Sequence, residues 1–84
     1  MAITKSTSVS YLTSSGAEFS TLVDAKYREM ADIFLQIFAN SGIPTGNNVA
    51  QNGASTLGKY FVSINSTTLS ALNQSITACR NANP

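Results

Sequence analysis

The sequence predicts an all-α fold, a helical hairpin of two amphipathic helices preceded by a flexible or strand-like N-terminal arm. Two long segments, residues 15–40 and 54–80, carry apolar residues at helical spacing. Between them, residues 41–53 are rich in Gly, Pro and Asn and predict the turn that joins the helices. The 84 residues are enough for one small domain, 1–84.

The arm comprises residues 1–14, which place a few apolar side chains among Ser and Thr. Val9 and Tyr11 alternate with serine, a spacing that permits a short strand. A terminal segment without anchors is commonly loose. Two alternatives therefore stay open: a flexible arm, or an arm that docks on a neighbouring subunit by adding a strand or filling a groove.

The first helix, 15–40, is predicted from its ends and its apolar face. Ser15 and Glu18 match a capping box, in which the hydroxyl and the carboxylate each accept from a backbone amide at the helix start. Gly42 and Pro44 follow the last apolar residue and predict the stop. The predicted apolar face consists of Phe19, Leu22, Val23, Tyr27, Met30, Ile33, Phe34, Ile37 and Phe38.

Lys26 lies inside this apolar arc. Its aliphatic stem can pack while the ammonium reaches the edge of the face. The alternative is a contact with an acidic residue of a neighbouring subunit.

The second helix, 54–80, has a polar stripe opposite its apolar face. A strand would scatter those polar residues over both faces, so the stripe favours a helix. Two alternatives stay open, a short strand within residues 59–64 and a break at Gly58. Cys79, near the helix end, is either a small buried residue or a contact between subunits.

Four apolar residues exceed what two packed helices can cover. Leu35 points toward the charged side of the first helix. In the second helix the apolar arc spans about 200°, although a helix with one neighbour needs little more than 100°. Exposed apolar patches of this extent mark interaction surfaces. We therefore predict a protein interface at Leu35, Val62, Leu69 and Ile76.

The composition excludes most catalytic and metal chemistry. Charged residues make up 11% of the chain, against about 25% in average proteins, and the net charge is +1. There is no His and a single Cys, which leaves no disulfide framework and no Cys/His metal site. The four acidic residues suit capping and surface roles, and no base that could activate a serine is evident. We predict no enzyme, no cofactor and no catalytic, cofactor-binding or metal-binding residue.

Charge and hydropathy also limit which kinds of partner and which cellular location are expected. Five basic residues spread over positions 5 to 80 cannot neutralise many phosphates, so no nucleic acid is expected. The longest apolar run, near 33–39, falls far short of the ~20 residues of a membrane span. No signal peptide and no small-molecule substrate site is apparent. We expect cytoplasmic synthesis, then assembly in a virion or outside the cell.

These observations predict a non-enzymatic structural subunit of a homo-oligomeric particle, most simply a small virion protein of a phage. Ser, Thr and Asn together contribute 29 of the 84 residues, a near-neutral surface that associates easily. The partners would be copies of this chain or a larger structural protein. A small adaptor that binds one protein through an apolar helix face is an alternative.

Residues 64–67, Ile-Asn-Ser-Thr, are similar to a stretch in some needle subunits of type III secretion systems. The helical hairpin with a Gly/Pro/Asn turn resembles the same family, whereas the first helix is much more aromatic and the Pro-containing turn differs. This resemblance implies a second alternative, a filament or secretion-needle-like subunit.

Overall fold

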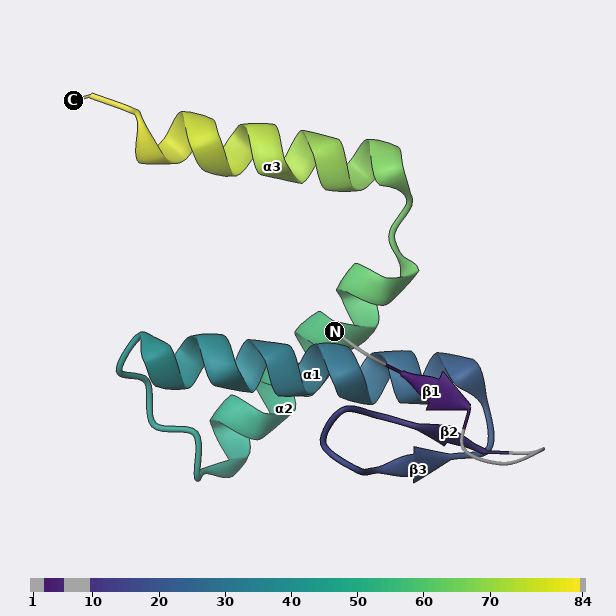
Figure 1. The fold of residues 1–84 in the computed structure, drawn as a ribbon. Helices are drawn as coiled ribbons and strands as arrows, with labels where there is room; N and C mark the ends of the chain where they lie inside the picture. Colours follow the sequence, from purple (N-terminus) through teal and green to yellow (C-terminus); the bar gives the residue numbers. More distant parts are fainter. Residues whose placement is uncertain (1–2, 6–9, 84) are drawn as a thin grey trace.

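The chain is mostly helical, with a small sheet at its N-terminal end (Figure 1). The computed structural model describes residues 3–5 and 10–83. The strands are β1 (Thr4–Lys5), β2 (Tyr11–Leu12) and β3 (Glu18–Phe19), and the helices are α1 (Leu22–Asn40), α2 (Asn48–Ser63) and α3 (Ser66–Arg80).

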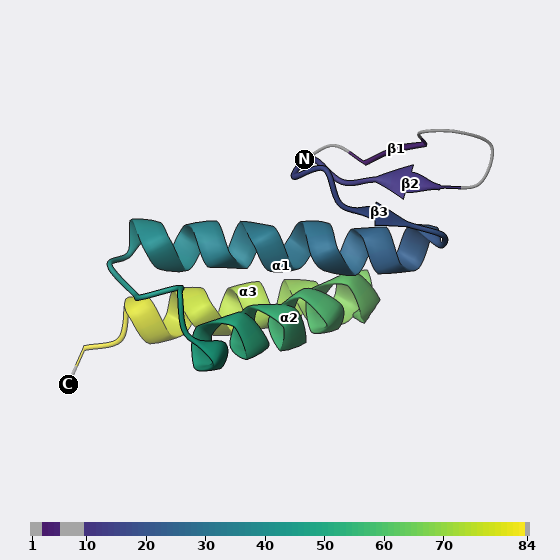
Figure 2. The ribbon, with the colours of Figure 1, turned by 90° about the horizontal axis from the view of Figure 1, so that it is seen from below.

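The predicted arm is strand-like where the structure describes it. β1, β2 and β3 form an antiparallel sheet in that order, with Lys5 opposite Tyr11 and Tyr11 opposite Phe19. The sheet lies beside the N-terminal half of α1 (Figure 2). Residues 1, 2 and 6–9 of the predicted arm lie outside the described residues.

The start predicted for the first helix was wrong, because residues 13–17 form the turn between β2 and β3. Gly16 has a φ of +91°, and its amide donates to the Thr13 carbonyl at 3.0 Å. The Thr13 hydroxyl accepts from the Ala17 amide at 3.1 Å, so these hydrogen bonds close a hairpin turn instead of a helical turn. The N-cap of α1 is Thr21, whose hydroxyl accepts from the Asp24 amide.

The predicted stop of this helix is confirmed. Gly42 adopts a φ of +82°, and the Ile43 amide donates to the Phe38 carbonyl at 2.9 Å. This six-to-one hydrogen bond is that of a Schellman motif, which satisfies a carbonyl that the helix end leaves open.

The predicted turn 41–53 and the continuous helix 54–80 were wrong in their bounds, because two asparagines act as N-caps. The Asn47 side chain accepts from the Ala50 amide at 2.9 Å and starts α2 inside the predicted turn. The Asn65 side chain accepts from the Thr68 amide at 2.7 Å. Ile64 is extended, with a ψ of 151°, so the predicted second helix is divided at residues 64 and 65 into α2 and α3.

The Asn65 cap gives a first prediction. Replacing Asn65 with alanine removes the acceptor of the Thr68 amide and should destabilise α3 by about 1 kcal/mol. Asn65→Asp keeps an oxygen in the same place and should retain most of the stability. Helix content measured by circular dichroism against urea tests both variants; equal midpoints for Asn65→Ala and the parent would contradict this role of the cap.

α1 and α2 pack closely, and α2 runs back along α1 (Figure 2). Gly58 permits this approach, because a Cβ built on it would lie 2.9 Å from the backbone nitrogen of Ala31. It is therefore a packing position inside α2 and not the helix break that the sequence allowed. Aromatic rings extend the contact, since Phe34 and Phe61 have centroids 5.4 Å apart.

α3 packs extensively against no other described element. It projects from the end of α2 and runs in the same direction as α1 in both views (Figures 1 and 2). The radius of gyration is 15.2 Å, whereas a compact domain of this length has about 12 Å. The single chain thus leaves one whole helix beside the packed body.

Candidate interaction surface

The structure places the four predicted interface residues at different sites. Leu35 and Val62 were expected to face water, but both are half-buried. Leu35 lines a groove between α1 and α2, whereas Val62 lines a second hollow with Ile3, Lys26 and Met30. Leu69 and Ile76 are 39% and 46% exposed and share one face of α3. The prediction of an exposed apolar face therefore applies to α3.

The face of α3 that carries Leu69 and Ile76 is a continuous apolar seam. Leu69, Leu72, Ile76 and Cys79 follow one another at steps of three, four and three residues. Such alternation is the spacing by which one helix packs along another. Cys79 is exposed and free, so the interpretation of a small buried residue does not hold for the single chain. We name these four residues the α3 seam.

A second seam runs along α1. The three-and-four spacing continues through Val23, Lys26, Met30, Ile33 and Ile37. Val23 and Ile37, near its two ends, are 45% and 49% exposed. Lys26 itself is exposed, which fits both the snorkelling interpretation and a contact with a neighbouring subunit. We name these five residues the α1 seam.

Helical periodicity alone does not separate the α1 seam from the rest of the apolar face of the first helix, which was predicted as one broad face. In the structure α2 covers the side at Tyr27 and Ala31, next to Gly58, and the sheet covers the side at Glu29. The three-and-four spacing of the α1 seam was the signal in the sequence that could have identified it as a separate surface.

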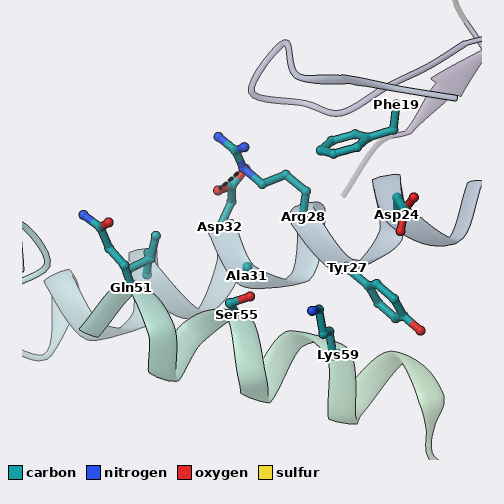
Figure 3. Close-up of a pocket in the computed structure, with 10 residues that line it drawn as sticks. Phe19, Asp24, Tyr27, Arg28, Ala31, Asp32, Gln51, Ser55 and Lys59 are labelled. Carbon is teal, nitrogen blue, oxygen red and sulfur yellow. Dashed lines mark hydrogen bonds and ion pairs between the residues drawn. The ribbon is translucent and has the colours of Figure 1, made fainter. Parts of the chain in front are cut away.

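A groove of about 660 Å³, lined by polar and apolar side chains, lies between α1 and α2 (Figure 3). Phe19 overlies it from β3, and Lys59 extends into it from α2 (Figure 3). Arg28 is paired with Asp32 at 3.1 Å, so this guanidinium already has a carboxylate partner. The groove brings together charges of both signs, from Asp24, Arg28, Asp32 and Lys59.

Among the residues that the structure describes, Glu29 is the one large side chain that is fully buried, with 2% exposure. Its carboxylate accepts from the Ser14 amide at 3.0 Å and from the Ser14 hydroxyl. Nearby, the Ser15 hydroxyl donates to Asp32 at 2.9 Å. These bonds hold the β2–β3 turn on α1, so the buried acid has a structural role.

No group of three or more His, Cys, Asp or Glu side chains comes together within residues 3–5 and 10–83. None of the helices described there combines the length and the hydropathy that a membrane crossing requires.

Comparisons with known proteins add no family to this description. No family model matches the chain, and searches of curated proteins and of solved structures return no significant match.

Proposed function

We propose that this protein is a self-assembling structural subunit of a homo-oligomeric particle, a small virion protein of a phage. In this proposal α1 and α2 form a helical hairpin that serves as the rigid body, and α3 makes contacts between subunits. One observation carries the proposal. Among the described residues, the apolar side chains that are fully buried are only those of Ala25 and Ala54, while large ones remain at the surface.

The surface area supports the same proposal. The chain exposes 5923 Å², whereas a folded monomer of 8.8 kDa exposes about 4,800 Å². The excess is about 1,100 Å², and a standard interface removes about 800 Å² from each partner. Association would bring the exposed area of each subunit into the range of ordinary folded proteins.

The low charge of α3 favours association between subunits. α3 carries a single charged residue, Arg80, and its remaining polar residues are Ser, Thr, Asn and Gln. Burying neutral residues avoids the large desolvation penalty that an unpaired ion would pay.

The direct test is light scattering after size-exclusion chromatography over a hundredfold range of concentration, with negative-stain imaging of the heaviest fraction. We expect discrete oligomers and closed particles. Uniform helical filaments would instead support the secretion-needle-like alternative. A concentration-independent monomer would overturn self-assembly and favour an adaptor with a foreign partner.

A matched pair of variants on α3 tests the surface. Leu69→Asp places a charge in the α3 seam and should reduce the association constant at least about tenfold, because an unpaired carboxylate would have to be desolvated. Asn73→Asp places the same charge at an exposed polar position of the same helix and should assemble nearly normally. Equal assembly of the two variants, each with unchanged helix content, would show that the α3 seam is not the contact.

A further inference from the structure

We propose that the α3 seam of one copy docks antiparallel on the α1 seam of a second copy, and that the two copies exchange α3 reciprocally about a two-fold axis. This inference rests on the proposed self-assembly and names its partner surface. The occupant of the α1 seam is thus α3 of another copy of this chain.

The two seams match in length and in character. From Leu69 to Cys79 the α3 seam rises about 15 Å, and from Lys26 to Ile37 the α1 seam rises about 16 Å. In an antiparallel register Leu69 lies beside Ile37. The same register then pairs the following members in order: Leu72 with Ile33, Ile76 with Met30, and Cys79 with Lys26.

Electrostatics select the antiparallel direction. Lys26 is the one charged member of the α1 seam. In the antiparallel register its ammonium lies at the last turn of the partner's helix, where the backbone carbonyls carry partial negative charge. A parallel register would place Lys26 beside the first turn of α3, where the exposed amides carry partial positive charge.

The remaining charges agree with this direction. Arg80 is the charged residue of α3 and lies in its last turn. All four acidic residues of the chain fall between Glu18 and Asp32, in the sheet and the first part of α1. Antiparallel docking brings Arg80 to this acidic end, whereas parallel docking brings it to the uncharged end at Asn40.

A chain cannot satisfy the antiparallel register with its own α3. Only residues 64 and 65 separate α2 from α3, and in the structure α3 runs in the same direction as α1 (Figures 1 and 2). Folding back would therefore give the parallel register. A two-fold axis perpendicular to both helices reverses the direction of the partner, so its α3 reaches α1 antiparallel. Such an interface is self-complementary and joins the subunits in pairs, from which the proposed particle would be built.

The excess exposed area also indicates that α3 of a second copy covers the α1 seam, as the positions of Lys26 and Arg80 do. The excess exposed area, about 1,100 Å² per chain, is close to what each partner buries in a standard interface. A reciprocal exchange covers two seams on each chain at once.

The test is site-directed disulfide formation between two chains that each carry one cysteine. The parent contributes Cys79, and the second chain is Lys26→Cys/Cys79→Ser with a tag that makes it larger. The matched control is Ile37→Cys/Cys79→Ser, because residue 37 lies beside Cys79 in the parallel register only. Both positions are exposed, so both variants are expected to fold. Each chain is mixed with the parent and oxidised with excess oxidised glutathione.

We expect roughly tenfold more mixed disulfide with the cysteine at 26 than with that at 37, because a disulfide needs Cα atoms within about 7 Å. Positions 26 and 37 are about 16 Å apart along α1. Equal or greater yield at 37 would overturn the antiparallel exchange, and so would no mixed disulfide at either position.

Light scattering of the untreated parent separates this failure from that of the proposed function. An oligomeric parent without the 26–79 disulfide leaves self-assembly standing and removes the antiparallel exchange. A parent that stays monomeric at every concentration removes both.

Discussion

Replacing Gly58 with alanine is expected to lower the free energy of unfolding by up to about 2 kcal/mol. The new Cβ would meet the Ala31 backbone nitrogen at 2.9 Å and the Tyr27 carbonyl oxygen at 3.1 Å. These atoms belong to the backbone of α1, so the contact is relieved only if the helices move apart. Overpacking of this kind costs about 1–3 kcal/mol, and the helix propensity of alanine recovers only about 1 kcal/mol.

Gly53 provides the matched control in the same helix. A Cβ at this position meets nothing within 4 Å, and Gly53 is not among the glycines with positive φ. Gly53→Ala should therefore raise the free energy of unfolding by about 0.5–1 kcal/mol. Urea denaturation followed by circular dichroism, at the same protein concentration, measures both. If the two alanine variants shift the midpoint in the same direction, α1 and α2 do not approach as closely as the structure places them.

Removing the buried carboxylate of Glu29 should have the second large effect, a loss of about 2–3 kcal/mol. Glu29→Ala leaves the Ser14 amide without its acceptor and opens a space under the β2–β3 turn. Hydrogen bonds to charged groups contribute about 1.5–3 kcal/mol. Because Glu29 anchors the turn, we also expect faster hydrogen exchange in β2 and β3 than in α2.

Two further variants test whether the stability lost in Glu29→Ala comes from the buried carboxylate. Glu29→Gln keeps the shape and one accepting oxygen, and should lose about half as much stability. Arg28→Ala breaks the neighbouring ion pair with Asp32, which is partly solvent-exposed, and should lose no more than about 0.5 kcal/mol. Chemical denaturation gives all three values. A Glu29→Ala loss no larger than that of Arg28→Ala would mean that Ser14 finds an equivalent acceptor elsewhere.

Local signals in the sequence identified much of the helical part of the fold. The Asn-Ser-Gly stop after α1 is confirmed, because Gly42 needs no partner from elsewhere to adopt its left-handed conformation. Phe34 was predicted on the apolar face of the first helix, and its ring does pack against that of Phe61, which lies within the predicted second helix. These features depend on one residue or on one helical period.

The same local signals were misleading where two conformations compete for one residue type. Ser15 and Glu18 match a helix start, yet Ser15 donates to Asp32, seventeen positions along the chain. Asn65 lies inside the segment that was predicted as one continuous helix, yet its side chain accepts from the Thr68 amide and starts a new helix. In both cases the hydrogen-bond partner of the side chain decides the conformation. Helical periodicity in the sequence does not show which partner a side chain will bind.

The sequence by itself determined that this protein is mostly helical, poor in charge and richer in apolar surface than two helices can cover. Only the tertiary structure decided where that surface lies. It depends on which sides of α1 are taken by α2 and by the sheet, and on the division at Ile64 and Asn65 that holds α3 apart. Periodicity identifies which residues share a face of a helix. Which face stays uncovered is a property of the packed elements, because each neighbour removes one side of the helix from solvent.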